Sequence, residues 1–275
     1  MNAKSVIVFL FLCSSTSFGQ VSDLNTLLMN STFKIQQDRK LGTCFILGRP
    51  MRTNPKQAYY VLITANHVLD SLPKDRANII LRTKTGNSYS RLPHQIQIRR
   101  NGIPLWTKHP DVDVAAMYVD IPDEAYLTLL PMTFLASDSI LSYFEVHPGD
   151  ELFSLGYPYG AEANEAGFPI LRSGKISSYP LLPVKLVKTF LFDFEVFGGN
   201  SGGPVYFVES NRVYAGGTHT GIVQFIIGIA IQEKIMKEKS VTMTESREIF
   251  YKLGLANVVH ANFIRETIEM LSPLD

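Results

Sequence analysis

The amino-acid sequence predicts an all-β fold in two halves, closed by one C-terminal helix. Short runs rich in β-branched and aromatic residues, broken by turn residues, extend from about residue 30 to residue 120 and resume after residue 145. Runs at this spacing favour a β-barrel or a β-sandwich over alternating strands and helices. The tail of the chain departs from this pattern, because its apolar residues recur at helical intervals.

The expected strands of the first half are the runs STFKI, GTCFILG, AYYVLITA, ANIILRT, HQIQIRR and DVAAMYVD. Those of the second half are ELFSLGYP, PILRSGKIS, KTFLFDFEVF, GPVYFVES, RVYAGG and GIVQFIIGIAI. Residues 126–145 hold fewer β-forming residues and several breakers, so they are expected to connect the two halves. The sequence therefore divides into an N-terminal β-unit at 20–125, a connection at 126–145 and a C-terminal β-unit at 146–275.

The closing helix is predicted from the tail LANVVHANFIRETIEML. Its apolar residues recur every three to five positions, as on one face of an amphipathic helix: Val258, Val259, Phe263, Ile264, Ile268 and Leu271. We expect this helix to pack on the second β-unit.

The composition is that of an ordinary globular chain without the charge of a nucleic-acid-binding protein. The chain has 275 residues, 45% of them hydrophobic, which is enough to bury a substantial core. Lys and Arg number 26 and Asp and Glu 25, which gives a formal net charge of +1. Binding to nucleic acid or to an anionic membrane is associated with a clear excess of positive charge. We therefore expect a protein or peptide as the partner, and no nucleic acid.

The first residues, MNAKSVIVFLFLCSSTSFGQ, are typical of a secretory signal peptide over residues 1–19. Lys4 precedes an apolar run from Val6 to Leu12, which is shorter than the about 20 residues that span a membrane. We expect cleavage near Gly19 and soluble release, either secreted or periplasmic in a bacterium, without stable membrane insertion. Lipid attachment at Cys13 is less favoured, because a lipoprotein signal has a small residue where Leu12 stands.

Cleavage of the signal would leave Cys44 without a partner for an internal disulfide. Small exported eukaryotic domains usually rely on disulfides, whereas a domain of about 250 residues buries enough surface without them. This favours a bacterial envelope or secreted protein. We interpret Cys44 as a small buried hydrophobic residue, with a redox role as the less favoured alternative.

The stretch FGGNSGGPV places Ser201 among glycines and a proline. A serine attacks a carbonyl carbon when a base lies within hydrogen-bond reach, a carboxylate orients that base and donors stabilise the oxyanion. His67 follows the apolar run VLITA and is the candidate base. Asp113 directly precedes the small apolar residues VAAM and is the preferred carboxylate, with Asp111, beside Pro110, as the alternative.

Three stretches, TANHV, DVDVAAM and GNSGGP, resemble in sequence and order the histidine, aspartate and serine motifs of trypsin-like (chymotrypsin superfamily) serine peptidases. The resemblance is closest to their disulfide-free bacterial branch, which includes Deg-type protease domains. It implies two antiparallel β-barrels of chymotrypsin type with a catalytic triad between them. One departure is Cys44, which stands where the family's first-barrel strand often has a glycine.

The resemblance also implies a role for each residue of the triad. His67 would take the proton of Ser201 and return it to the leaving amine, while Asp113 would hold the histidine tautomer. The backbone N–H groups of Gly199 and Ser201 would form the oxyanion hole. Gly199 could adopt the positive φ that aims its N–H at the oxyanion, a conformation that other residues resist.

By the same resemblance, certain residues surround the substrate side chain that precedes the cut bond. Glu195, six positions before the serine, would favour Lys or Arg if it points into this pocket. The alternative is that Glu195 faces solvent while Phe194 and Val196 face the core. On a later strand Gly228 and Ala230 would leave the pocket open and apolar, and Ala230 stands where a glutamate-specific peptidase has a histidine.

The letters GNSGG also match the G-x-S-x-G nucleophile elbow of α/β-hydrolases, which are esterases and lipases. That elbow continues into a helix, whereas GPVYFV is a strand-forming sequence. It also needs a downstream acid and histidine, for which Glu245 and His260 are the formal candidates.

No histidine spacing indicates a metal site, and neither a metal nor a cofactor is expected. His219 is the remaining histidine of greatest interest, because its glycine-rich loop was expected beside the substrate cleft. The predicted function is an exported serine endopeptidase that acts through an acyl-enzyme. The alternative is a catalytically silent or gated protease-fold module that binds or chaperones other proteins.

Overall fold

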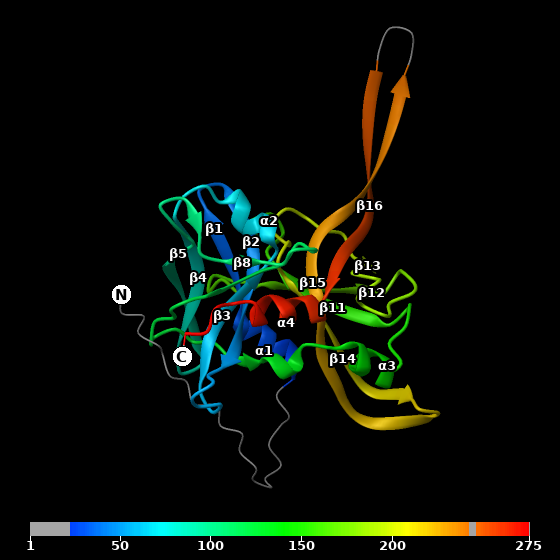
Figure 1. Cartoon of the computed structure of the whole chain (residues 1–275), viewed down its shortest axis with the longest axis horizontal. Coiled ribbons are helices and arrows are strands. Elements are labelled where there is room, and N and C mark those ends of the chain that lie inside the picture. The colour runs from blue at the N-terminus through cyan, green and yellow to red at the C-terminus, as the bar shows by residue number, and fades with distance from the viewer. Residues whose placement is uncertain (1–22, 242–245, 275) are drawn as a thin grey trace.

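The structure is a computed structural model that describes residues 23–241 and 246–274. It contains two large β-sheets, with helix α4 (Ala261–Glu269) near the junction between them (Figure 1). The predicted signal peptide lies outside the described residues. The predicted all-β fold class with a C-terminal helix is confirmed.

The first sheet follows the strand order β5-β4-β1-β2-β3-β9-β8, and a short strand, β10, pairs with β2. Pairs along this path are antiparallel, whereas β10 runs parallel to β2. The strands are β1 (Thr32–Gln37), β2 (Lys40–Pro50), β3 (Ala58–Thr64), β4 (Arg76–Thr85), β5 (Ser88–Gln97), β8 (Thr107–Lys108), β9 (Ala115–Tyr118) and β10 (Leu130–Pro131).

The second sheet is antiparallel and follows the order β12-β11-β14-β15-β16-β13. An isolated bridge between Ile176 and Phe192 links the edges of this sheet without a paired ladder. The two β-barrels that the sequence resemblance implies are therefore open sheets rather than closed barrels. The strands are β11 (Glu151–Gly156), β12 (Ile170–Lys175), β13 (Thr189–Asp193), β14 (Pro204–Tyr214), β15 (Gly217–Val241) and β16 (Ser246–His260).

Short elements complete the described chain. Leu130–Pro131 and α3 lie in the segment that the sequence identifies as the connection between the halves. No helix in the described ranges is both long and apolar enough to cross a membrane. These elements are α1 (Leu24–Ser31), α2 (Asn66–Ser71), α3 (Asp138–Tyr143), the 3₁₀ turns η1 (Met132–Phe134) and η2 (Pro158–Gly160), and the small strand pair β6 (Arg99–Arg100) and β7 (Ile103–Pro104).

The two sheets share one hydrophobic core. Phe45 and Ile63 of the first sheet belong to the same cluster of buried residues as Phe207 and Ile229 of the second. Burial of apolar surface contributes about 25 cal/mol per Å² removed from water. Separation of the sheets would expose this apolar surface and is therefore unfavourable. The relative position of the sheets, and of any residues that meet between them, is therefore fixed by core packing.

The predicted start of the C-terminal helix is wrong. Val258 and Val259, assigned to the helix from their spacing, lie in β16 and pair with Ala230 and Ile229. These β-branched residues fit a buried central strand, and the helix begins only after His260. A short run of adjacent apolar residues is compatible with both periodicities, which explains the error.

Helix α4 also packs more widely than expected. It contacts β15 and β16 of the second sheet but also β8 and β9 of the first. His109, one residue after β8, lies edge-on to Phe263 of the helix, with 5.2 Å between ring centroids, and 3.2 Å from the Glu266 carboxylate. The helix therefore bridges the two sheets.

Strands β15 and β16 continue past the body of the protein as a two-stranded arm, defined here as residues 232–241 and 246–254 (Figure 1). The pairing register shifts between Ala230 and Gln232 and again between Glu233 and Ile235, where the ribbon leaves the body. Bulges of this kind bend a strand and increase its twist. They also break the period-2 pattern, which is why the sequence does not predict the arm.

Candidate active site

His67 lies in the first turn of α2, directly beyond the end of β3. The residues of β3 are almost all buried, so the chain leaves the core at Thr64 and turns at Ala65, whose backbone is extended (φ −68°, ψ 138°). The His67 side chain is 48% exposed, which places the imidazole at the surface of the first sheet.

Asp113 is brought to His67 by strand pairing. Asp113 lies two residues before β9, which runs antiparallel to β3 with Ala115 opposite Thr64. The residues just before β9 therefore lie beside the residues just after β3. Asp113 Oδ2 lies 2.6 Å from His67 Nδ1, and Oδ1 accepts a hydrogen bond of 2.9 Å from the backbone N–H of His67.

The other candidate carboxylate, Asp111, lies in a different environment. It is exposed and forms an ion pair of 3.0 Å with Lys188. The structure thus pairs His67 with Asp113, the preferred candidate, rather than with Asp111.

The environment of Asp113 favours its ionised form. Burial alone would raise the pKa of this carboxyl, but hydrogen bonds from the ring and backbone of His67, and from the backbone of Asn66, outweigh burial and hold the pKa below its ordinary value. An ionised carboxylate at Nδ1 accepts a hydrogen bond from the Nδ1–H group, which leaves Nε2 as the basic nitrogen. Asp113 therefore orients His67 in the tautomer that a general base requires.

The loop that carries Ser201 depends on glycine at two positions for its backbone shape. Gly199 has φ of +100° and Gly202 has φ of +90°, which other residues rarely adopt. A Cβ on Gly199 would also overlap the Tyr157 carbonyl, and one on Gly202 would overlap the Thr43 carbonyl. These glycines allow both the turn and the close approach of neighbouring backbone.

The first sheet holds this loop through Thr43 of β2. Its N–H donates to the Ser201 carbonyl at 2.9 Å, and its hydroxyl donates to the Gly199 carbonyl at 2.6 Å. The Thr64 hydroxyl donates in turn to the Thr43 carbonyl at 2.7 Å. Thr64 precedes His67 by three residues, so these bonds fix the serine loop beside the strand end that leads to the histidine.

The peptide group between Gly198 and Gly199 is held by a hydrogen bond to its carbonyl oxygen. The N–H of Tyr159 donates to the Gly198 carbonyl at 2.6 Å. A trans peptide carries its C=O and N–H on opposite sides, so the Gly199 N–H points away from Tyr159. Within the described ranges no group accepts a hydrogen bond from the N–H of Gly199 or of Ser201. Both predicted oxyanion donors are therefore available.

The Ser201 hydroxyl donates a hydrogen bond of 2.8 Å to the carbonyl of Ile231 in β15. The neighbouring pair, Gly202 and Ala230, is joined by a bond of 2.8 Å from the Gly202 N–H to the Ala230 carbonyl. Transfer of the Ser201 proton to a base requires rotation of the hydroxyl away from Ile231. In this conformation the Ser201 hydroxyl is therefore bonded to a backbone carbonyl rather than to a base.

The predicted pocket residues lie in two different environments. Glu195 is exposed between the buried Phe194 and Val196, the alternation expected of a solvent-facing glutamate. Gly228 and Ala230 lie in the interior of the second sheet, paired on β15. Their role in a pocket stays a prediction.

Sequence reasoning missed the residues that support the serine loop. Thr43, Tyr159 and Ile231 act through backbone groups or one hydroxyl, and no local motif marks them. The run GTCFILG drew attention to Cys44 instead. Cys44 is fully buried, which fits its interpretation as a core residue, and burial raises the pKa of its thiol.

Two other histidines lie apart from the pair of His67 and Asp113. His219 stacks on Tyr214, with 3.8 Å between ring centroids, at the β14–β15 turn. That turn is ten residues along β14 from Pro204, roughly 30 Å at the rise of an extended strand, so His219 does not border the serine. His260 is buried beside Phe190.

The strand that follows Ser201 is incompatible with a nucleophile elbow, which continues into a helix. Ser201 leads into β14, which begins at Pro204, rather than into a helix. Glu245, the acid of that alternative, lies outside the described residues.

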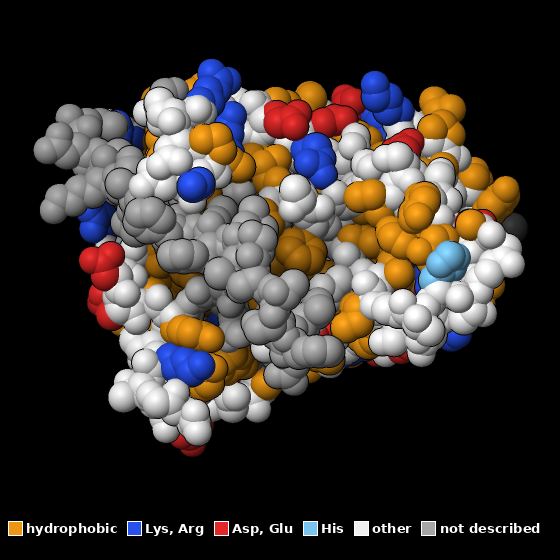
Figure 2. All heavy atoms as spheres, turned by 90° about the horizontal axis from the view of Figure 1, so that it is seen from below, with side chains coloured by type: hydrophobic (Ala, Val, Ile, Leu, Met, Phe, Trp, Pro, Cys, Tyr) orange, Lys and Arg blue, Asp and Glu red, His pale blue; other side chains and the backbone are white. Residues whose placement is uncertain are grey.

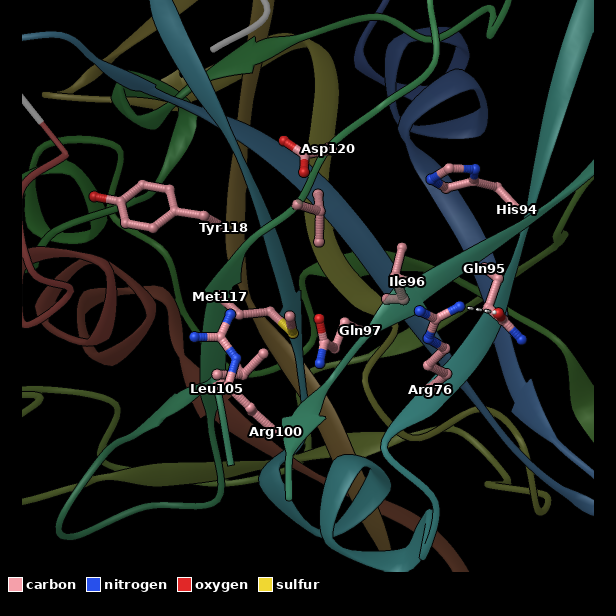
Figure 3. Close-up of a pocket in the computed structure, with 11 residues that line it drawn as sticks. Arg76, His94, Gln95, Ile96, Gln97, Arg100, Leu105, Met117, Tyr118 and Asp120 are labelled. Carbon is pink, nitrogen blue, oxygen red and sulfur yellow. Dashed lines mark hydrogen bonds between the residues drawn. The ribbon is translucent and has the colours of Figure 1, made fainter. Parts of the chain in front are cut away.

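A separate hollow of about 420 Å³ lies on the first sheet, among β4, β5 and β9 (Figure 3). Arg76, His94, Arg100 and Asp120 are among its lining residues, and Arg76 donates to the Gln95 side chain at 3.0 Å. Its lining includes no serine, threonine or cysteine, and the hydroxyl of its lining residue Tyr118 donates a hydrogen bond of 3.1 Å to the Ser272 carbonyl. Across the described residues, no cluster of three or more His, Cys, Asp or Glu side chains could hold a metal ion.

Comparisons with known proteins identify the family of this chain. The crystal structure of Rv3671c from M. tuberculosis H37Rv, in an inactive mutant form, is similar over 96% of this chain and 96% of that chain, with 16% sequence identity and a TM-score of 0.45. No curated protein matches the chain. The family model of the trypsin-like peptidase domain matches residues 35–215, a range that contains His67, Asp113 and Ser201. The chain belongs to the family of trypsin-like peptidase domains.

Proposed function

We propose that this protein is a serine endopeptidase that cleaves peptide bonds through an acyl-enzyme, with Ser201 as nucleophile, His67 as general base and Asp113 as the orienting carboxylate. The observation that carries the proposal is the double contact of Asp113 with His67, at 2.6 Å and 2.9 Å. Folding alone does not require an exposed histidine to be held by an ionised carboxylate at Nδ1. A general base does require it.

The proposed reaction begins when a peptide carbonyl occupies the space next to Ser201. The hydroxyl turns from Ile231 to His67, the oxygen attacks the carbonyl carbon and His67 takes the proton. The N–H groups of Gly199 and Ser201 stabilise the oxyanion, and the proton then passes to the leaving amine. Water hydrolyses the acyl-enzyme by the same steps.

Labelling with a fluorophosphonate tests the nucleophile directly. We expect wild type to be labelled at Ser201, Ser201→Ala to remain unlabelled and His67→Ala to react at least about 10³-fold more slowly. Asp111→Asn is the matched control and should react like wild type. If wild type remains unlabelled even with a peptide mixture present, the protein is a silent member of the fold, which is the competing interpretation.

A gated enzyme is the second candidate, favoured by the hydrogen bond from the Ser201 hydroxyl to Ile231. In that case a bound peptide must first release the hydroxyl. Labelling of a gated enzyme should accelerate when non-cleavable peptides are added, whereas labelling of a constitutively active enzyme should slow because the peptides compete.

We also propose that the protein is exported and that cleavage near Gly19 releases it in soluble form. Mass spectrometry of the protein recovered from the periplasm or medium of a producing bacterium should give a mature chain that starts near Gln20. A chain that keeps residues 1–19, or that carries lipid on Cys13, would contradict soluble release.

The exposed Glu195 supports at most a weak preference for substrates with Lys or Arg before the cut bond. Cleavage of a peptide library by wild type and by Glu195→Gln tests this preference. A selective decrease of cleavage after basic residues supports a pocket role, and unchanged selectivity assigns Glu195 to the solvent-facing surface.

A further inference from the structure

The arm is the direct continuation of the strand that touches the candidate nucleophile. Ile231, whose carbonyl accepts the Ser201 hydrogen bond, immediately precedes Gln232, the first residue of the arm. Strand β14 accompanies β15 as far as the pair Pro204–Ile229. A polypeptide whose bond reaches Ser201 therefore lies against the root of the arm.

Beyond the root, the edge of β15 is open. Over residues 232–241, β16 is the strand that pairs with β15, and the described chain places no strand on the opposite edge. An edge strand presents every second N–H and C=O outward, and extended peptides pair with such edges. At about 3.3 Å per residue this edge is roughly 30 Å long, enough for about eight to ten residues of an extended chain.

The arm also exposes large apolar side chains that a two-stranded ribbon has no layer to cover. Their exposed fractions are 48% for Ile235, 51% for Met236, 55% for Phe250, 41% for Tyr251 and 45% for Leu253. Single exposed apolar residues are ordinary, but a cluster on one projecting element indicates a surface that binds a partner.

These side chains lie on both faces of the ribbon. Met236 pairs with Tyr251, so these two share one face, whereas the next pair, Lys237 with Phe250, lies on the other. The Lys237 ammonium lies 5.4 Å from the centroid of the Phe250 ring. A strand added at the open edge points its own side chains alternately to both faces, so each set would meet apolar neighbours.

The root of the arm is braced by an ion pair. The carboxylate of Glu233 on β15 is only 7% exposed and lies 2.9 Å from the Lys252 ammonium on β16. This contact joins the two strands where the ribbon leaves the body. A braced root reduces the ordering cost when a chain binds along the edge.

We propose that the arm binds an extended, unfolded segment of the substrate polypeptide as an added β-strand, so that long unfolded chains are the preferred substrates. The proposal rests on the peptidase activity proposed above. Continuity of the arm with the Ser201 contact selects a substrate segment as the occupant, rather than a second copy of this chain.

A second group of exposed apolar residues serves as the matched control. Val213, Ile222 and Tyr143 are 64%, 45% and 64% exposed. They lie around the β14–β15 turn and α3, and Figure 2 shows hydrophobic side chains gathered on the underside of the molecule, where Figure 1 places these elements. This surface belongs to the same sheet but extends away from Ser201.

The test compares three threonine pairs in the Ser201→Ala background. Ile235→Thr with Phe250→Thr and Met236→Thr with Tyr251→Thr remove apolar groups from either face of the arm, and Val213→Thr with Ile222→Thr is the control. Threonine keeps strand propensity, and circular dichroism verifies folding. Binding of fluorescein-labelled β-casein, an unfolded polypeptide, is measured by fluorescence anisotropy.

We expect at least one of the two double variants of the arm to bind β-casein at least 10-fold more weakly than Ser201→Ala alone. The affinity of the control double variant should stay within twofold of that value. Casein peptides N-methylated at alternate residues should bind more weakly than unmethylated ones, because strand addition uses backbone N–H groups. Equal affinity of all three pairs overturns the proposal. The proposal is also overturned if sedimentation detects a dimer of the protein that the paired arm substitutions disrupt while casein binding stays unchanged.

Fluorophosphonate labelling of the same pairs with Ser201 intact separates this proposal from the proposed function. Arm pairs that are labelled at the wild-type rate but bind casein weakly support the proposal. Arm pairs that lose labelling in parallel with binding overturn it, because they disturb the serine loop itself. An unlabelled wild type refutes the peptidase activity, while casein binding by Ser201→Ala still reports on the arm.

Discussion

Asp113 contacts His67 at two points, with one carboxylate oxygen on the ring Nδ1 and the other on the backbone N–H. The backbone bond fixes the carboxylate relative to α2, and the ring bond then fixes the imidazole relative to the carboxylate. The orientation of His67 therefore depends on one side chain from a different strand.

Replacement of Asp113 by Asn should lower kcat by about 10⁴-fold, because an amide that donates to Nδ1 stabilises the wrong tautomer. KM should change little, since Asp113 contacts no substrate. Steady-state kinetics on a peptide substrate measure both constants. Asp111→Asn removes the ion pair with Lys188 instead, and a comparable loss in that variant would refute the assignment of Asp113.

Gly199→Ala should lower kcat by at least about 10²-fold. The added methyl group overlaps the Tyr157 carbonyl, and φ of +100° is unfavourable for alanine, so the oxyanion N–H must move. Gly198→Ala is a close control, because a Cβ at that position meets no atom within 4 Å. Equal losses in both variants would contradict a specific role for the Gly199 peptide.

His260 should make the fold sensitive to acid. It is 1% exposed and neither ring nitrogen has a hydrogen-bond partner. Burial lowers its pKa from 6.5 to about 4, despite the opposing influence of Asp138. Because the pKa is lower in the folded state, its contribution to stability is fully present above pH 6.5 and is lost as the pH falls towards 4.

His260→Leu should therefore lose less stability than wild type between pH 7 and pH 4.5, by about 2 to 3 kcal/mol. Urea unfolding at the two pH values measures this difference. Parallel loss of stability in wild type and variant would show that His260 does not become protonated on unfolding.

Arg82 should be the arginine whose loss destabilises the first sheet most. It is fully buried, donates to the carbonyls of Gly167, Met29 and Thr32, and lies over the rings of Phe33 and Phe168. We expect Arg82→Ala to lower the free energy of unfolding by about 3 to 5 kcal/mol, because it leaves a cavity and removes the side-chain donor to the Met29 carbonyl, whereas the Gly167 and Thr32 carbonyls keep the Tyr157 hydroxyl.

Chemical denaturation measures the change at Arg82. Arg76→Ala on the same strand, which removes an exposed side chain, should cost less than about 1 kcal/mol. A similar small cost for Arg82→Ala would contradict the structural role assigned to it.

The sequence predicts the strands of the body well, because their β-branched and aromatic residues are buried in short runs between turns. It predicts the pairing of His67 with Asp113 because each residue adjoins such a run, and the resemblance supplies the order of the motifs. The sequence does not predict the arm, and the reason is physical. The register shifts between Ala230 and Gln232 and between Glu233 and Ile235 interrupt the alternation of buried and exposed residues. The apolar residues of the arm are exposed, so they do not mark a buried face.

The contacts around Ser201 were also beyond sequence patterns. Thr43 donates its N–H to the Ser201 carbonyl, and Ile231 offers its carbonyl to the Ser201 hydroxyl; any residue supplies these main-chain groups. The docking of the two sheets identifies Thr43, and the pairing of β14 with β15 identifies Ile231.

The division of the proposed triad between two sheets has a consequence for the nascent chain. His67 and Asp113 are synthesised early, but the serine loop requires Thr43 on one side and Ala230 of β15 on the other. A polypeptide still emerging from the ribosome therefore holds a base and its carboxylate without a positioned nucleophile. For the peptidase proposed above, hydrolytic activity therefore arises only when the last third of the chain has been made and folded, which protects the cell during synthesis.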